Sequence, residues 1–366
     1  MRDVLDDLIR WSAGSEPAGL ATVVASLGGG APRPVGAAMA VGPDGTAVGG
    51  VSGGCVEAAV YDLAREVAVT GRPQLARFAG SPDDVFAVSR PCGGELLVFV
   101  ERVDRSCRAD LRRLESARRQ RVPVAAVTCV EPADHPLLGR RHLVGPAVRS
   151  GSDDEVAWRA RALLAGGTSE LVRVDPDGPG FFVASYRPAP RMLLLGSAHG
   201  VAALADVGSL LGYHVTVCDP RPVFTTQQRF PSAAEVVVRW PDEYLRDEAS
   251  AGRLDARTVL CVLTHDLKTA LPALDVALRL PVGYIGVMGS RRSQLDLRDR
   301  LLAAGHDTGA LDRLAAPIGL DLGAVDSAEM AVSVAAEIVT MVRGGTGQRL
   351  SALRGPIHAA PAPVGM

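Results

Sequence analysis

The second half of the chain constrains the fold most strongly, because short apolar runs alternate there with stretches of helical pattern. The segment MLLLG at 192–196 is apolar throughout, as expected for a strand that is covered on both faces of a sheet. Further short runs rich in β-branched residues follow at 214–219, 235–238, 258–263 and 284–288. Strands that alternate with helices favour a parallel sheet, so we predict a Rossmann-like doubly wound domain in this half.

The first half also mixes strand and helix patterns, which predicts a separate N-terminal α/β domain. Strands are expected at 19–26 and 95–100, where the chain is apolar and rich in β-branched residues. A hairpin is expected around the turn Pro43-Asp44-Gly45. Apolar residues recur at helical spacing directly after Cys55, so a helix is expected there.

Two prolines in the segment RPAPR mark the expected domain boundary, because proline discourages regular structure. We predict an N-terminal α/β domain at 1–187 and a Rossmann-like domain at 191–345. The last helix of the second domain is expected to begin near Asp326, with Glu329 completing a capping box. The tail at 346–366 is rich in proline, alanine and glycine and is expected to be irregular.

Composition and charge argue against several functional classes. A net charge of -2 and an aromatic content of 4% do not favour nucleic acid as a partner. No apolar run has the length of a membrane span, and the N-terminal segment MRDVLDDLIRW does not resemble a signal peptide. The 6 cysteines form no C-x-x-C pair and match no zinc or iron–sulfur spacing. We therefore expect a protein of the reducing cytoplasm that binds neither nucleic acid nor a membrane.

The segment GSAHG, between an apolar strand and a helix, has the character of a dinucleotide-binding turn. Small residues at Gly196, Ala198 and Gly200 would let backbone N–H groups approach a pyrophosphate at a helix N-terminus. Asp219 ends the next strand, where an acid that binds ribose is expected. The alternative is a Rossmann domain that kept its shape but lost or changed its ligand, since Ala198 stands where a second glycine is usual.

Two further motifs follow later strands of the same predicted sheet. His265, in the segment THD, would act as an acid, a base or a hydrogen-bond donor to a ligand. Ser290 and Arg291, in the segment GSRR, would bind an anion at a helix N-terminus. The alternative is structural in both motifs. Asp266 would cap the following helix, with His265 as a loop residue whose hydrogen bonds are satisfied locally. Ser290 would cap the other helix, with both arginines of GSRR solvated on its surface.

The segment VSGGCVEAAV places one thiol directly before a predicted helix. Ser52, Gly53 and Gly54 precede Cys55, so the thiol lies where backbone N–H groups and the helix dipole favour a thiolate. The alternative is that Cys55 is a small buried residue without chemistry.

A second thiol with flexible neighbours, Cys92-Gly93-Gly94, and a glycine-rich loop that ends at Arg33 extend this pattern. The sequence does not establish that these segments meet in space. The four remaining cysteines are predicted to be core residues: Cys107, Cys129, Cys218 and Cys261.

Taken together, these motifs resemble those of the XdhC/CoxI family, the xanthine dehydrogenase accessory proteins. The N-terminal resemblance is carried by GGGAPRPVGAAMAV, GGVSGGCVEAAV and CGGELLVFVE. The C-terminal resemblance is carried by LLLGSAHGVAALADVGSLLGYHVTVCDPRPVF, LTHD, YIGVMGSRR and APIGLDLGAVDSAEMAVSVAAEIV. The combination is more specific than any one of the motifs.

This resemblance implies a maturation factor that has no turnover of its own. Such a protein binds the molybdenum cofactor, assists its sulfuration by a cysteine desulfurase, and helps to insert it into a molybdenum hydroxylase. Cys55 and Cys92 would then be soft ligands for molybdenum, with Gly53, Gly54, Gly93 and Gly94 donating N–H groups to its oxygens. The second domain would hold a nucleotide or the phosphate of the pterin, and a homodimer is expected.

The rival hypothesis is an oxidoreductase that binds NAD(P) in the second domain. In that case Asp219 would bind the unphosphorylated ribose, and Cys55 or His265 would act on the substrate. The sequence offers no Tyr-x-x-x-Lys proton donor near the expected crevice, which disfavours this hypothesis.

Overall fold

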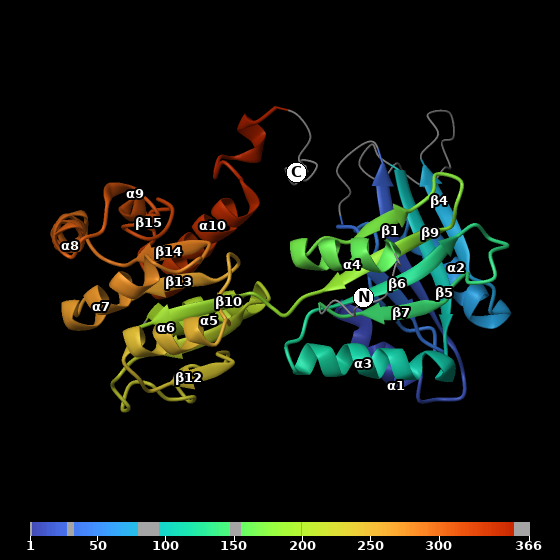
Figure 1. Cartoon of the computed structure of the whole chain (residues 1–366), viewed down its shortest axis with the longest axis horizontal. Helices are drawn as coiled ribbons and strands as arrows, with labels where there is room; N and C mark the ends of the chain where they lie inside the picture. Colours follow the sequence, from blue (N-terminus) through green and yellow to red (C-terminus); the bar gives the residue numbers. More distant parts are fainter. Residues whose placement is uncertain (1, 28–32, 80–94, 147–154, 199, 355–366) are drawn as a thin grey trace. The chain divides into compact units, whose positions relative to one another are not determined.

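The chain forms two compact units, Met1–Pro188 and Ala189–Leu353, each with its own sheets and core (Figure 1). The computed structural model describes residues 2–27, 33–79, 95–146, 155–198 and 200–354. In these residues no helix is both long and apolar enough to cross a membrane.

The second unit is built on a six-stranded sheet in which every neighbouring pair of strands is parallel. The order is β12-β11-β10-β13-β14-β15, so the first three strands run outward from β10 in one direction and the last three run outward in the other. This order is that of dinucleotide-binding domains, and the predicted Rossmann-like doubly wound sheet is confirmed. The strands are β10 (Arg191–Leu195), β11 (His214–Cys218), β12 (Glu235–Val237), β13 (Val259–Val262), β14 (Tyr284–Val287) and β15 (Leu314–Ala315).

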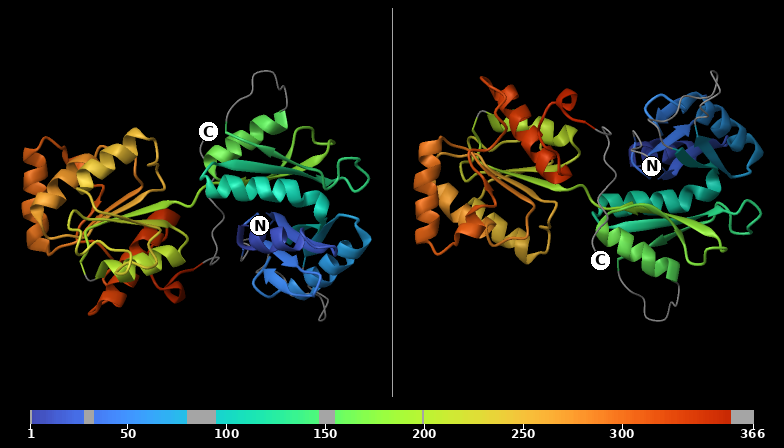
Figure 2. Two further views of the ribbon diagram at one scale, coloured as in Figure 1. Left: turned by 90° about the horizontal axis from the view of Figure 1, so that it is seen from below. Right: turned by 90° about the horizontal axis from the view of Figure 1, so that it is seen from above.

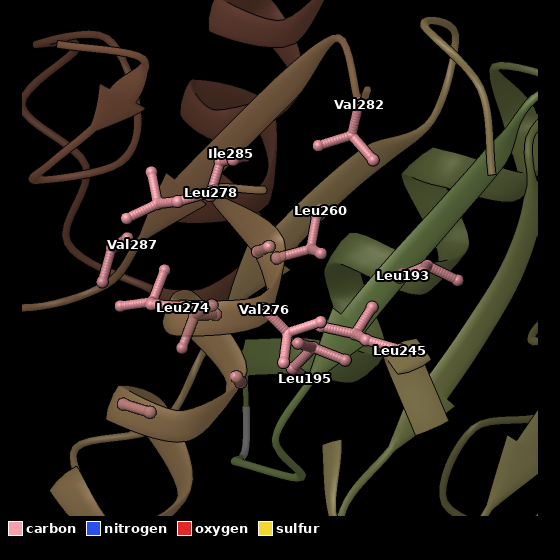
Figure 3. Packing of buried hydrophobic residues seen from close by; sticks show 14 of the residues in the cluster. Leu193, Leu195, Leu245, Leu260, Leu274, Val276, Leu278, Val282, Ile285 and Val287 are labelled. Carbon is pink, nitrogen blue, oxygen red and sulfur yellow. The ribbon is translucent and has the colours of Figure 1, made fainter. Parts of the chain in front are cut away.

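Helices cover both faces of this sheet, which explains why β10 is apolar at every position after its first residue. One face packs against α5 (Gly200–Leu210) and α10 (Ser327–Arg343). The other face packs against α6 (Pro241–Ser250), α7 (Leu267–Ala277), α8 (Arg291–Ala303) and the short α9 (Thr308–Leu311). Figure 3 shows this second cluster, in which Leu193 and Leu195 of β10 share one apolar core with side chains of β13, β14, α6 and α7.

The ends of α10 follow the predicted signals. The Asp326 side chain accepts a hydrogen bond from the Glu329 N–H, and the Glu329 side chain accepts one from the Asp326 N–H, so the capping box is confirmed. The helix stops at Gly344, whose φ of 68° is the left-handed conformation that glycine adopts easily. Beyond it, in the tail predicted to be irregular, the structure contains one short 3-10 helix, Leu350–Ala352.

The first unit contains two antiparallel sheets. The five-stranded sheet has the order β3-β2-β1-β5-β4, and its β2–β3 hairpin turns at Pro43-Asp44-Gly45, as predicted. The four-stranded sheet has the order β7-β6-β9-β8. The strands are β1 (Ala18–Leu27), β2 (Ala38–Val41), β3 (Ala47–Gly49), β4 (Gln74–Ala79), β5 (Glu95–Val103), β6 (Val124–Glu131), β7 (Arg141–Val144), β8 (Glu170–Arg173) and β9 (Gly180–Tyr186).

The two sheets and their helices form layers around three apolar clusters. The outer face of the five-stranded sheet packs against α2 (Glu57–Thr70), and the outer face of the four-stranded sheet packs against α4 (Glu155–Gly166). Figure 2 shows α4 on the side of its sheet that faces away from the five-stranded sheet. The cluster between the sheets also takes in α1 (Leu5–Trp11) and α3 (Arg108–Arg119), while two 3-10 turns, Arg2–Val4 and Arg105–Cys107, lie beside these helices.

One ion pair crosses the apolar interior between the two sheets. Glu101 of β5 and Arg141 of β7 form a salt bridge with side chains that are only 8% and 7% exposed. The Arg141 Nε also donates to the Thr128 hydroxyl at 3.2 Å, which links β6 to the same pair. A buried pair of this kind is costly to break from one side, because the remaining charge is left without a partner.

We predict that Glu101→Gln lowers the free energy of unfolding of the first unit by about 3–5 kcal/mol, since it strands the Arg141 guanidinium in the core. Replacing both partners, with Glu101→Leu and Arg141→Met, should recover most of this loss. Urea denaturation followed by circular dichroism measures both effects. Asp6→Asn is the control, because the exposed Asp6–Arg118 pair should contribute less than about 1 kcal/mol. A single variant no less stable than this control would show that the buried pair does not join the sheets.

Candidate functional site

The loop before α2 is organised around the carboxylate of Glu57. One carboxylate oxygen accepts the N–H groups of Ser52 and Gly53, each at 2.8 Å, and the other accepts the N–H of Gly54 at 2.8 Å. The Ser52 hydroxyl donates to the same carboxylate, and longer bonds come from the N–H groups of Val51 and Val56 at 3.3 Å. Gly53 and Gly54 adopt φ values of 91° and 127°, which turn their N–H groups toward one acceptor and which side-chain-bearing residues rarely adopt.

These hydrogen bonds favour the ionised form of Glu57. Burial alone would raise the pKa of this carboxyl group, but the bonds from Ser52, Gly53 and Gly54 lower it to about 2. From the sequence, the N–H groups of Gly53 and Gly54 are predicted to donate to the oxygens of a ligand. In this structure they bind the protein's own carboxylate, so a ligand would reach them only after Glu57 moves.

Cys55 lies at the end of this loop, and α2 begins two residues later at Glu57. Its thiol is free and half-buried, and it packs against the apolar cluster between α2 and the five-stranded sheet. The thiol therefore sits on a segment whose backbone is held on both sides by Glu57. That position suits a side chain that is presented to a ligand, and it differs from that of a fully buried core cysteine.

Several of the predicted partners of Cys55 are placed differently or lie beyond the described residues. Cys92, Gly93 and Gly94 fall in the range 80–94, outside the part of the chain that the structure describes. Arg33 is described, and its guanidinium forms an ion pair with Asp3 at 3.4 Å. Within the described residues no cluster of three or more His, Cys, Asp or Glu side chains could hold a metal ion.

Three of the other cysteines are core residues, as predicted: Cys129, Cys218 and Cys261. Burial raises the pKa of the Cys218 thiol to about 12 and also raises the pKa values of Cys129 and Cys261. Cys107 is half-buried rather than buried, and packs against the cluster between the two sheets. The raised pKa values make the three buried thiols poor nucleophiles and poor ligands.

In the second unit, the glycines of the predicted dinucleotide turn have structural reasons to lack a side chain. Gly196 has a φ of 124°, and a Cβ there would lie 2.6 Å from the backbone oxygen of Leu263. Gly200 begins α5, and a Cβ there would collide with the terminal methyl of Met330 on α10. Both glycines thus allow close packing around the switch point of the sheet, whether or not a ligand is bound.

A pocket of about 390 Å³ opens beside this turn, at the carboxyl ends of the central strands. It brings together two predicted residues, Ala198 and His265, from the loops that follow β10 and β13. The complete lining is Ser197, Ala198, Arg221, Phe224, Arg229, Leu263, Thr264, His265 and Asp266. The volume lies within the range typical of small-molecule sites, and the location is the one where open α/β sheets bind ligands.

Asp219 lies behind this pocket with its carboxylate already occupied. Its side chain is 1% exposed. One oxygen accepts the backbone N–H and the Nε of Arg221, both at 2.9 Å, and the other accepts the Nη2 at 2.7 Å. Burial opposes ionisation of Asp219, but its hydrogen bonds with Arg221 lower its pKa below the ordinary value. The acid predicted to bind a ribose is therefore covered by a guanidinium.

The other two predicted anion contacts, Ser290 and Arg291, lie at the start of α8. The Ser290 hydroxyl caps α8 by accepting the Ser293 N–H at 3.2 Å, and Arg291 is exposed on the first turn. Neither residue lines the pocket. Asp266 likewise caps α7 by accepting the Lys268 N–H at 3.0 Å, as the structural alternative expected.

Four residues that form the loop before α2 or line the pocket were not predicted from the sequence: Glu57, Arg221, Phe224 and Arg229. The segment SGGCVE does hold a signal for Glu57, because consecutive glycines before a helix often form a concave array of N–H groups that binds an anion. The segment CDPRPVF holds one for Arg221, since an arginine beside the ribose-binding acid is typical of sites that accept a phosphate.

The chain matches two sequence models of one family. The model of the XdhC and CoxI family matches residues 11–79, and the model of the XdhC Rossmann domain matches residues 192–338. The first match includes the loop with Cys55 and Glu57, and the second spans every lining residue of the pocket.

Relatives align over most of the chain. The molybdenum cofactor insertion chaperone PaoD of Escherichia coli is 29% identical over 88% of this chain and 82% of its own length. A Bacillus subtilis protein, described as a probable subunit of xanthine dehydrogenase, is 27% identical over 88% of this chain and 93% of its own length.

A crystal structure from Bacillus halodurans, described as a xanthine dehydrogenase, shares the fold with a TM-score of 0.72 at 24% sequence identity. The match covers 96% of this chain and 98% of that one, so the pairing of an antiparallel α/β unit with a Rossmann-like unit is common to both. With the two family matches and the alignments over most of its length, the chain belongs to the XdhC and CoxI family.

Proposed function

We propose that this protein is an accessory factor that binds the molybdenum cofactor and delivers it to a molybdenum hydroxylase of the xanthine dehydrogenase type. The alignment with a named cofactor insertion chaperone over 88% of the chain supports this role. The structural observation that supports cofactor binding is the loop of residues 51–56. Glu57 fixes the backbone of this loop, and Cys55 has a free thiol there.

In this proposal Cys55 binds or shields the molybdenum centre of the cofactor. Thiolates are suitable ligands for soft metal centres, and a half-buried thiol excludes part of the surrounding water from the bond. Cys92 is proposed as a second thiol for the same centre. When bound, the cofactor would supply the molybdenum and its sulfur exchange. The protein would supply the Cys55 thiol on a loop that Glu57 holds, and the N–H groups of that loop would serve the cofactor only after Glu57 moves.

The proposal extends to partners that the family resemblance implies. A cysteine desulfurase would deliver the sulfur atom while the cofactor is held, and the hydroxylase would then receive the sulfurated form. We also propose that the protein works in the cytoplasm and as a homodimer, in which two copies of the Cys55 loop serve one client.

The competing function is an oxidoreductase dependent on NAD(P). The pocket at the sheet switch point, with His265 in its lining, is the observation that favours it. Hydride transfer between NAD(P)H and an added acceptor, followed by absorbance, would support this function. The absence of such transfer leaves the accessory role as the better account.

We predict that the protein isolated anaerobically under reducing conditions carries molybdopterin, detected as its fluorescent oxidised form. Cys55→Ala should weaken binding about tenfold or more, which corresponds to the loss of about 1.4 kcal/mol of binding free energy, and the bound amount should fall accordingly. The matched control is Cys107→Ala, which removes another half-buried thiol of the same unit and should leave the bound amount unchanged.

Equal pterin content in the wild type, Cys55→Ala and Cys107→Ala would contradict the role of Cys55. Absence of pterin from all three, with folded protein by circular dichroism, would contradict cofactor binding itself. A client pull-down that survives the loss of Cys55 but carries no cofactor would instead support a purely structural recruiter.

We predict that Glu57→Gln loosens the Cys55 loop and lowers the free energy of unfolding by about 1–3 kcal/mol at neutral pH, because charge-assisted hydrogen bonds are lost. Glu57 has a pKa lowered from its ordinary 4.5 to about 2, so its ionised form stabilises the fold above the unfolded pKa. The difference between wild type and Glu57→Gln should therefore shrink as the pH falls from about 5 toward about 2.

Urea denaturation across this pH range measures the effect. Glu66→Gln, an exposed change on the same helix, is the control and should give a difference near zero at every pH. A Glu57→Gln difference that stays constant with pH would show that the charge of Glu57 does not hold the loop.

A further inference from the structure

The pocket of the second unit contains an arginine that has no carboxylate partner among the described residues. The Arg229 guanidinium donates to the Phe224 backbone oxygen at 2.8 Å and otherwise lies over two aromatic rings. It is 5.5 Å from the centre of the Phe224 ring and 5.6 Å from that of Phe230. The side chain is half-buried, so its position is fixed by packing while its charge is left uncompensated.

Arg221 approaches the same ring. Its guanidinium lies 5.3 Å from the centre of the Phe224 ring, and its side chain is 54% exposed. The bonds to Asp219 use Nε and Nη2 of Arg221, and Nη2 also donates to the Ser197 hydroxyl at 3.2 Å. Pairing with Asp219 therefore does not require Nη1.

Two guanidiniums around one ring repel each other, and the acids of the pocket relieve this repulsion only in part. Asp219 is paired with Arg221, and Asp266 accepts from the Lys268 N–H as the cap of α7. Arg229 remains without a carboxylate partner among the described residues, and an anionic group of a ligand would pair with it. Guanidiniums recognise phosphate oxygens with directed pairs of N–H donors, which lysine cannot provide.

The same arrangement disfavours an unphosphorylated ribose. A ribose diol would need a carboxylate oxygen of Asp219 as its acceptor, yet that side chain is 1% exposed and covered by Arg221. Binding the diol would require Arg221 to leave a bidentate pair. A phosphate, in contrast, would bind Arg221 in its present place.

We infer that this pocket binds the phosphate monoester of a small ligand between Arg221 and Arg229, and that it selects against the unphosphorylated form. The inference extends the proposed function to the second unit, but its test does not depend on Cys55. Two sources share this chemistry: the 2′-phosphate of a nicotinamide dinucleotide, and the phosphate monoester of the pterin of the molybdenum cofactor.

The first experiment compares phosphorylated ligands with their unphosphorylated forms by titration calorimetry of the full chain. NADPH is compared with NADH, and the oxidised pterin of molybdopterin is compared before and after its phosphate has been removed. At least one phosphorylated ligand is expected to bind about tenfold tighter or more than its counterpart. The phosphorylated ligand that binds, NADPH or the pterin, identifies the source of the phosphate. All four titrations are repeated with Cys55→Ala, which should bind as the wild type does.

The second experiment tests the two arginines. Arg229→Gln should weaken the phosphorylated ligand about tenfold or more and reduce the dependence of binding on salt, without affecting the unphosphorylated ligand. Arg279→Gln is the matched control, because that arginine pairs with Asp275 on the surface of the same unit. Arg221→Gln alone would strand the buried Asp219, so it is combined with Asp219→Asn, and this pair should also weaken the phosphorylated ligand.

The inference is overturned if NADH binds as tightly as NADPH and the pterin binds as tightly without its phosphate. It is also overturned if Arg229→Gln and Arg279→Gln bind the phosphorylated ligand equally well, or if none of the four ligands binds saturably. Because Cys55→Ala is included, loss of the cofactor role of Cys55 would be seen separately from loss of this pocket.

Discussion

A carboxylate that is removed from water needs donors from the protein, and this requirement organises both units of the chain. Glu57 takes its donors from the backbone of a single loop, Asp219 takes them from Arg221, and Glu101 takes them from Arg141. Glu57 thereby holds a loop, Asp219 holds the segment that carries Arg221, and Glu101 joins two strands that lie in different sheets. The first two of these segments border the places where we propose that ligands bind.

The donors differ, and so do the consequences for binding. The donors at Glu57 are backbone N–H groups, so an anion that replaced the carboxylate could use the same donors and hold the loop in its place. In the second unit, Arg221 is held in place by Asp219, so this carboxylate would stay when a ligand binds. The ligand would then contact the free donors of Arg221 and the guanidinium of Arg229. The two units thereby supply complementary chemistry, a thiol with backbone donors in one and guanidiniums in the other.

Local patterns predicted much of this fold. The apolar run of β10, the turn at Pro43-Asp44-Gly45 and the capping box of α10 each depend on residues close in sequence, and each was found as predicted. The short β15 was not predicted, because two residues carry no periodicity. The order of the antiparallel strands could not be predicted from local patterns either, since it depends on pairing between distant segments such as β1 and β5.

The candidate sites divide in the same way. The motifs placed Cys55 shortly before a helix, and Ala198 and His265 after the ends of strands, as the structure has them, because strand ends and helix starts can be read from spacing. Glu57 and Arg229 were missed because their roles depend on how loops turn back. Glu57 binds the backbone of Ser52, five positions earlier in the chain, and Arg229 lies in the pocket lining over the Phe224 ring.

Gly200 meets Met330 where α5 begins, so the first turn after β10 touches the last helix of the unit. These positions are 130 residues apart in the chain, yet a side chain at position 200 would require the Met330 side chain to move. Among related sequences, a side chain at the first position should accompany a shorter one at the second. Substitutions in the final α-helix would then act on the start of α5, close to Ala198 of the pocket, without altering a single residue of the pocket lining.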